Sequence, residues 1–355
     1  MPTYVQDAHT SSRNYVCENI FIGLIFSVLR SSHYSCHTSR SFFSALKNSS
    51  TVYRMIFHTM KYVVPISSLW VVTLLIFSCI HVNGISTVKS VKNLRPVVSG
   101  GLIYRSASLD ELSVEDAELL LSSTSEYFPK PLVGVIDLRN KDEVEKGKLK
   151  QTEGSKYFYS PSSSPVQFHH VPILQDVNAF WDEAINRMDP TERIQATLKT
   201  IVQGGALDRA AARNLERGGC SALYTVMMAS CSTRILQALQ LCLKLQQQRD
   251  GVVLFHCQKG KDRTGVLSML LQSCYYQQTD ENICESYALS AKLLGEDKTE
   301  TKTSDNDSGL IDWSHFRGSP VSAMEETLQW TRQTYGSIDA YLDQNQMLDK
   351  NLLQK

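Results

Sequence analysis

A short glycine-containing segment places one cysteine and one arginine six positions apart: His256-Cys257-Gln258-Lys259-Gly260-Lys261-Asp262-Arg263-Thr264-Gly265. The apolar run 251–255 before it predicts a buried strand, and the run 266–271 after it predicts the first turns of a buried helix. Backbone N–H groups at a helix N-terminus attract anions, and the same field favours the thiolate form of Cys257. The predicted chemistry is attack of this thiolate on phosphorus.

The other residues of the segment have predicted roles in the same chemistry. The planar fork of Arg263 suits two phosphoryl oxygens, and Gly260 would let the backbone approach the ligand. His256 would orient the turn, while Thr264 would donate its hydroxyl to the sulfur and ease its departure. The residues predicted to line the anion site are His256, Gln258, Lys259, Gly260, Lys261 and Gly265. The competing interpretation is a buried structural cysteine beside a solvated turn.

His-Cys, five residues and Arg-Thr-Gly together resemble the signature of the cysteine-dependent protein tyrosine phosphatase superfamily. The stretch Gly260-Lys261-Asp262-Arg263 is similar to the microbial-type branch, which acts on phosphotyrosine and phosphoinositides. Weaker similarity extends over about residues 88 to 355, in the segments Asn93-Leu94-Arg95, Ile103-Tyr104-Arg105-Ser106-Ala107-Ser108-Leu109, Val135-Ile136-Asp137-Leu138-Arg139, Ala222-Leu223-Tyr224, Met324-Glu325-Glu326-Thr327-Leu328, Tyr335-Gly336-Ser337-Ile338 and Tyr341-Leu342. The resemblance implies a phosphomonoester hydrolase with a phosphocysteine intermediate. No cofactor or metal is expected, since no His or Cys cluster has ligand spacing and Cys257 supplies the nucleophile.

The acid that protonates the leaving group is the open point of this mechanism. The family often uses an aspartate from a separate loop, but Trp-Pro-Asp does not occur in this sequence. Asp262 is the first candidate and Asp176 the second. A purely structural Asp262, bonded to the loop amides or to Arg105, is the alternative. Asp137 and Arg139 are predicted to be a structural pair that braces the site.

Composition separates a catalytic part from an N-terminal leader. The chain has 355 residues, a formal net charge of +0 and 42% hydrophobic residues, which gives no bulk charge for nucleic acid. Residues 1–61 are basic and serine-rich, and 62–84 predict a signal peptide or signal anchor. The catalytic domain is then 85–355. A start at Met55 or Met60 would make the first residues a gene-model extension, and a buried core helix is the alternative for the apolar run.

The pattern beyond the leader predicts an α/β fold with a central, mostly parallel sheet flanked by helices. Expected strands are 101–105, 132–138, 169–173 and 252–256, and expected helices are 114–122, 178–188, 222–247 and 321–343. Residues 176–219 predict a helical insertion, either a lid or ordinary packing helices, and 296–309 a polar surface loop. Cys220, Cys231, Cys242, Cys274 and Cys284 are expected in or near the core, with redox pairing to Cys257 as the alternative.

Two lysines of the loop are predicted to determine the choice of substrate. Lys259 and Lys261 would add positive charge at the pocket mouth, which suits an inositol phosphate head group, unless both face solvent. The predicted partners are phosphotyrosine proteins or phosphoinositide lipids, together with a membrane through the N-terminal segment. The predicted location is the membrane or secretory pathway, or the cytoplasm if the leader is an artefact. A rhodanese-like sulfurtransferase and a catalytically silent phosphate-binding module are the competing functions.

Overall fold

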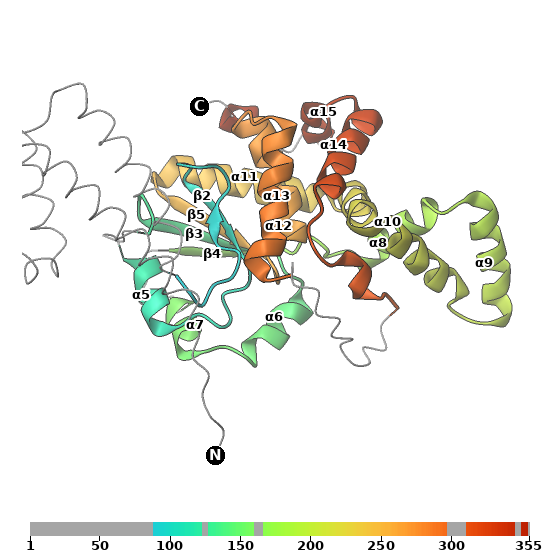
Figure 1. Ribbon diagram of the computed structural model, residues 1–355, viewed down its shortest axis with the longest axis horizontal. Helices are drawn as coiled ribbons and strands as arrows, with labels where there is room; N and C mark the ends of the chain where they lie inside the picture. Colours follow the sequence, from blue (N-terminus) through green and yellow to red (C-terminus); the bar gives the residue numbers. More distant parts are fainter. Residues whose placement is uncertain (1–87, 123–126, 160–165, 297–309, 345–348, 354–355) are drawn as a thin grey trace, which may run out of the picture. The chain divides into compact units, whose positions relative to one another are not determined.

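A five-stranded sheet forms the centre of the fold in the computed structural model (Figure 1). Its order is β1-β2-β5-β3-β4, and the strands are β1 (Arg95–Pro96), β2 (Ile103–Ser106), β3 (Leu132–Asp137), β4 (Gln167–His170) and β5 (Val252–His256). β1 pairs antiparallel with β2, and the remaining pairs are parallel. The predicted mostly parallel sheet is confirmed, and β5 occupies the predicted residues 252–256 at its centre.

The structure describes residues 88–122, 127–159, 166–296, 310–344 and 349–353. They belong to a unit that spans Gly84–Lys355. The leader 1–61, the apolar segment 62–84 and nearly all of the polar stretch 296–309 lie outside the described residues. Within those described ranges no single helix is long and apolar enough to cross a membrane, although one bent pair of helices meets the length and composition criteria together.

Both faces of β5 are buried, which explains why residues 252–255 are all apolar. Successive side chains of a strand point to opposite faces. Val252 and Leu254 pack in one hydrophobic cluster with α5 (Val114–Leu121) and α7 (Glu153–Phe158), while Val253 and Phe255 pack in a second, larger cluster. The helices of the second cluster include α10 (Ala206–Ser230), α11 (Ser232–Arg249) and α12 (Asp262–Leu270). Two-sided burial is the usual condition of a parallel strand.

Two helices that the sequence predicted as continuous are divided in the structure. The expected helix 222–247 breaks at Cys231, where α10 and α11 meet at 85°. The expected helix 321–343 becomes α14 (Val321–Tyr335) and α15 (Ile338–Asp343), because Gly336 has φ +89° and Ser337 caps α15 by accepting from the backbone N–H of Ala340. Apolar periodicity continues across both breaks, so it could not reveal them.

The predicted helical insertion is confirmed as α8 (Val177–Asn186), α9 (Pro190–Val202) and the first half of α10. Gly219, part of the predicted stop, has non-helical backbone angles (φ 58°, ψ −147°) and kinks α10 instead of ending it. Phe180 and Ala184 of α8 join the core, as expected for packing helices, whereas a lid role stays a prediction. α9 lies beyond α8 and α10 from the sheet in Figure 1. Its Ile201 and Val202 are exposed.

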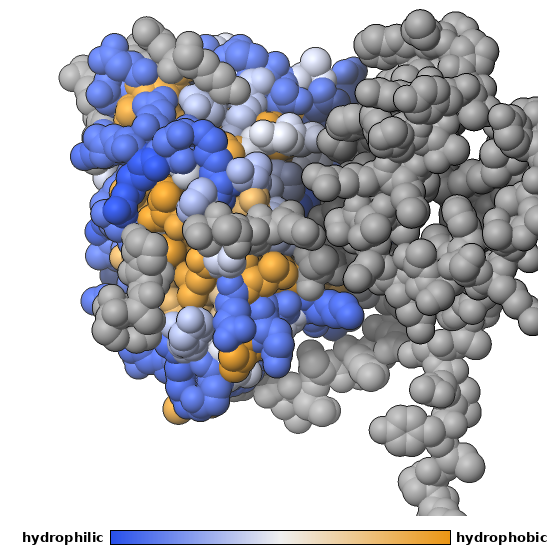
Figure 2. Space-filling model, turned by 90° about the vertical axis from the view of Figure 1, so that its left-hand side faces the viewer, coloured by the Kyte–Doolittle hydropathy of each residue, from blue (hydrophilic) through white to orange (hydrophobic). Residues whose placement is uncertain are grey.

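Further helices and helical turns complete the described part of the domain. They are α6 (Lys141–Lys148), α13 (Asp280–Leu294), the π-helical turn Leu271–Tyr275 and the short 3-10 turns Trp313–Phe316 and Lys350–Leu353. The cysteines expected in or near the core are confirmed as buried and unpaired, namely Cys220, Cys231, Cys242, Cys274 and Cys284. On the face shown in Figure 2, small groups of hydrophobic residues reach the surface among a hydrophilic majority.

Candidate active site

The carboxyl ends of the parallel strands bring chemically active residues to one edge of the sheet. In the strand register, His256 at the end of β5 is paired with Ser106 of β2 on one side and Asp137 of β3 on the other. His170 at the end of β4 is paired with Asp137. Ligands in α/β folds bind at this edge of the sheet.

The predicted cysteine loop connects this edge to a helix. β5 ends at His256 and α12 begins at Asp262, as the apolar runs indicated. Cys257 is buried, and the Oγ1 hydroxyl of Thr264 donates a hydrogen bond of 3.0 Å to its Sγ. The first N–H groups of α12 have no acceptor within the helix, which makes this helix end favourable for an anion. The sulfur therefore lies in the loop that leads to the N-terminus of α12.

Gly260 is required by the packing of the loop against β2. Its φ is +66°, and a Cβ at this position would lie 2.2 Å from the carbonyl oxygen of Ser106. The sequence suggested that the missing side chain makes room for a ligand. The structure shows that it makes room for the backbone of the neighbouring strand. At Gly265 a Cβ would lie 3.3 Å from the ring of Tyr287, so this glycine allows α13 to approach α12 closely.

Arg263 is held by an acidic residue of α6. Its two terminal nitrogens donate to the carboxylate of Glu143, NH1 to Oε2 at 2.5 Å and NH2 to Oε1 at 2.6 Å. Burial opposes both charges, but the hydrogen bonds and the charge of the partner outweigh it, so the pKa of Arg263 is raised and that of Glu143 is lowered. The pair uses one N–H of each terminal nitrogen, and a guanidinium carries five N–H donors in all.

Asp262 is fixed by a tyrosine of α10. Its Oδ1 accepts from the hydroxyl of Tyr224 at 2.7 Å, and that hydroxyl shares a second hydrogen bond of 2.7 Å with the hydroxyl of Tyr287. Burial, followed by the charge of Asp262, raises the pKa of Tyr224 well above its usual value, so Tyr224 remains protonated and can donate. For a structural Asp262 the sequence predicts the loop amides or Arg105 as hydrogen-bond partners. The structure shows Tyr224 as the donor instead. The carboxyl side chain is 28% exposed, which leaves it accessible to a ligand.

The two lysines of the loop lie in different environments. The ammonium of Lys259 is exposed and pairs with Glu296 at 2.9 Å. Lys261 is buried, and its Nζ donates to the carbonyl oxygens of Phe316 at 2.6 Å and Gly318 at 2.7 Å. Its expected position at the pocket mouth is therefore corrected, because two peptide carbonyls take the place of water around the ammonium.

Gln258, the remaining polar residue of the loop, is exposed. Its carbonyl oxygen accepts from the backbone N–H of Ser108 at 3.1 Å. A direct substrate contact of the Gln258 side chain stays a prediction.

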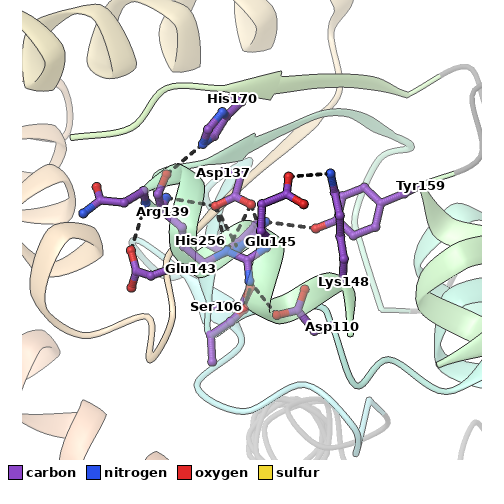
Figure 3. Close-up of polar contacts among 12 residues, drawn as sticks. Ser106, Asp110, Asp137, Arg139, Glu143, Glu145, Lys148, Tyr159, His170 and His256 are labelled. Carbon is purple, nitrogen blue, oxygen red and sulfur yellow. Dashed lines mark hydrogen bonds and ion pairs between the residues drawn. The ribbon is translucent and has the colours of Figure 1, made fainter. Parts of the chain in front are cut away.

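A buried ionic cluster lies behind the loop (Figure 3). Arg139 binds Asp137 through Nε and NH2 at 2.7 to 3.0 Å and binds Asp110 through NH1 at 2.5 Å. The predicted Asp137–Arg139 brace is thus present. The Nε2 atom of His256 lies 3.1 Å from the hydroxyl of Tyr159, and its Nδ1 lies 3.9 Å from Asp137. Burial lowers the pKa of His256 despite the opposing charge of Asp137, which favours a neutral ring.

Some residues around the loop were not singled out by the sequence. Glu143 stands three residues after Asn140, a capping-box spacing that predicts the start of α6 and gives no sign of a contact with Arg263. Tyr224 and Asn93 fell in family-like segments without an assigned role. Asp176, the second candidate for the acid, is the N-cap of α8, where its Oδ1 accepts from the N–H of Ala179 at 3.0 Å.

Comparison with known proteins agrees with this geometry. Residues 86–355 match the model of a tyrosine phosphatase family. A protein from Nostoc commune named tyrosine-protein phosphatase is 39% identical over 71 residues, which are 20% of this chain and 24% of that relative. The chain thus spans about a quarter of the length of this curated relative. With its mostly parallel sheet and its strand, cysteine loop and helix, the chain belongs to the tyrosine phosphatase family.

Proposed function

We propose that this protein is a cysteine-dependent phosphomonoesterase of the microbial-type branch, with Cys257 as nucleophile. The observation that carries the proposal is the 3.0 Å contact between the Thr264 hydroxyl and the Cys257 sulfur, at the junction of β5 and α12. A donor at that distance stabilises negative charge on sulfur. A buried cysteine with only a packing role has no need of this donor.

The first step forms a bond between Cys257 Sγ and phosphorus as the phosphorus–oxygen bond to the leaving group breaks. Arg263 binds two non-bridging oxygens, and Asp262 gives its proton to the departing oxygen. In the second step water attacks phosphorus and transfers a proton to Asp262, and the sulfur leaves as a thiolate. The Thr264 hydroxyl stabilises that thiolate through the existing hydrogen bond.

The proposed substrates are phosphotyrosine proteins and phosphoinositides. Lys259, the exposed lysine of the loop, would meet a second phosphate of a head group in this proposal. Lys261 belongs to the same loop, and its buried hydrogen bonds connect the loop to residues 316–318. In this proposal, Lys259 determines how strongly phosphoinositides are preferred over phosphotyrosine proteins.

The test is phosphate release by the full-length chain from a phosphotyrosine peptide and from phosphoinositides, with and without chelator. Cys257→Ser is the control for the nucleophile, and Lys259→Ala is the control for head-group recognition. We expect release to require Cys257, and Lys259→Ala to reduce turnover of phosphoinositides more than turnover of the peptide. No release from either substrate class would favour a silent phosphate-binding module, and turnover of thiosulfate would favour the sulfurtransferase.

We also propose that residues 62–84 direct the protein to a membrane or the secretory pathway. The support is the apolar composition of that stretch and the basic residues before it. The full chain and a form lacking residues 1–84 would be compared by cell fractionation. The same distribution for both forms would refute the targeting role.

A further inference from the structure

Two buried arginines face each other behind the cysteine loop. Arg95 of β1 and Arg105 of β2 are direct partners in the antiparallel register, and both side chains are buried. Like charges directly opposite each other destabilise a sheet, and buried charges normally have partners of opposite charge. Among the described residues, their hydrogen bonds go to carbonyl oxygens, an amide and a hydroxyl, and to no carboxylate. Two buried positive charges without a hydrogen-bonded carboxylate destabilise the fold, so we expect a negative charge nearby to offset them.

Arg105 donates hydrogen bonds to two backbone carbonyl groups of the loop. Its NH2 donates to the carbonyl oxygen of Gly260 at 2.7 Å and more weakly to that of Lys261 at 3.4 Å. In a trans peptide the carbonyl and the following N–H point in opposite directions, and the described chain has no cis bond. Holding these two carbonyls toward Arg105 therefore directs the N–H groups of Lys261 and Asp262 away from it.

A second donor supports the same carbonyl. Asn93, with φ +58°, donates from Nδ2 to the carbonyl oxygen of Gly260 at 2.7 Å and to that of Lys259 at 3.2 Å. The amide oxygen of Asn93 in turn accepts from Arg95. The β1–β2 hairpin thus places Arg95, Asn93 and Arg105 as one buried brace, with the Gly260 carbonyl at its end.

Arg105 lies beside the end of the strand that leads to the nucleophile, because it is the register partner of Phe255, two residues before Cys257. Burial lowers the pKa of Arg105 to about 10, and of the nearby charges that raise it, that of Cys257 is the strongest. The ionisable groups around it are Cys257, Asp262, Tyr224, Tyr287 and Arg95. Two of these, Tyr224 and Tyr287, have raised pKa values caused chiefly by burial and are neutral at physiological pH. The negative groups that offset the arginine are then a thiolate at Cys257, Asp262 and a bound phosphoryl group.

We propose that Arg105 is a positioning residue of the cysteine loop, which turns the loop N–H groups toward the phosphoryl group and stabilises the Cys257 thiolate from behind. The proposal deepens the proposed function and rests on it for its role in catalysis. The hydrogen bonds of Arg105 to the carbonyl oxygens of Gly260 and Lys261 are present without substrate, so the positioning role can be tested on the free protein.

The test follows alkylation of Cys257 by iodoacetamide as a function of pH in the full-length chain. The tryptic peptide 250–259 contains no other cysteine, so mass spectrometry reports this residue alone. The variants are Arg105→Met, which removes charge and donors, Arg105→Lys, which keeps the charge, and Asn93→Gly, which removes the second donor where φ is positive. Tungstate binding, measured by calorimetry, reports the anion site, and circular dichroism reports folding.

For Arg105→Met we expect the pH of half-maximal alkylation to rise by about one unit and tungstate affinity to fall about tenfold. Arg105→Lys should keep the alkylation profile near that of the wild type while its tungstate affinity falls, because one ammonium cannot reproduce the planar fork. Asn93→Gly should weaken tungstate binding with little change in the pH dependence of Cys257 alkylation.

A folded Arg105→Met variant with wild-type alkylation and tungstate binding would overturn the proposal. If that variant does not fold, Arg105→Lys decides the question, and unchanged tungstate affinity in it overturns the proposal. Alkylation needs no substrate, so these results can be obtained even if the wild-type chain releases no phosphate. Failure of the proposed function and failure of this inference are therefore distinguishable.

Discussion

Glu143 accepts hydrogen bonds from both terminal nitrogens of Arg263 with its two carboxylate oxygens, at 2.5 and 2.6 Å. The same carboxylate accepts from the backbone N–H of Asn140 at 2.8 Å, so the start of α6 fixes its position. Through this contact, the start of α6 holds the guanidinium of Arg263, which lies 120 residues away from Glu143 in the sequence.

Replacement of Glu143 by Ala should reduce kcat/KM for phosphomonoesters by about 10-fold to 100-fold, because a misdirected guanidinium no longer meets the transition state. Glu145→Ala is a matched control, since Glu145 lies on the same helix and pairs with exposed Lys148. Steady-state kinetics on an aryl phosphate would measure both. Equal kinetics for the two variants would contradict a positioning role for Glu143.

Asp262→Asn should slow hydrolysis of substrates with poor leaving groups by about 100-fold or more, because the departing oxygen loses its proton donor. Substrates with acidic phenols as leaving groups should be affected much less. The measurement is the dependence of kcat/KM on the leaving-group acidity. A uniform loss over the whole series would show that Asp262 is structural. Tyr224→Phe, which removes the 2.7 Å hydrogen bond, should show a weaker form of the same dependence.

Lys261→Ala should destabilise the domain by about 1 to 3 kcal/mol, because the carbonyls of Phe316 and Gly318 lose a buried donor. Lys259 is 52% exposed in its pair with Glu296, so we expect a change below about 1 kcal/mol for Lys259→Ala. Urea unfolding would compare the two variants. Similar stabilities would mean that water replaces the ammonium of Lys261 at no cost.

The Asp137–Arg139 brace should make the domain sensitive to acid. Burial raises the pKa of Asp137, but His256 and Arg139 outweigh it and lower the pKa to about 2. A lowered carboxyl pKa contributes stability that is fully present above the unfolded-state value of about 3.9, and this stability is lost as pH falls toward 2. At 13% side-chain exposure, the contribution is about 2 kcal/mol.

Urea unfolding between pH 3 and pH 6 would test this effect by comparing the wild type with Asp137→Asn. The wild type should be more stable at pH 6, and the difference should shrink as the pH decreases. A constant difference over this range would show that the ionisation of Asp137 does not contribute.

Local sequence signals predicted the strand, loop and helix of the cysteine segment well. The β-branched run before Cys257 and the apolar run after Thr264 define β5 and α12, because two-sided burial requires continuous apolar sequence there. The same signals failed at Cys231 and Gly336, where helices break without loss of apolar periodicity. Composition reveals which residues are buried, but the direction of a helix after a break depends on what it packs against.

By itself the sequence determined the strand, loop and helix around Cys257, the mostly parallel sheet and the buried cysteines, since each depends on residues adjacent in the chain or on periodic burial. Only the tertiary structure decided the partners of that segment: Glu143 for Arg263, Tyr224 for Asp262, and Arg105 for the Gly260 carbonyl. These contacts join residues between 38 and 155 positions apart. Hydrogen bonds of this kind require directions and distances that are set when separate strands and helices pack together, and no local pattern encodes them.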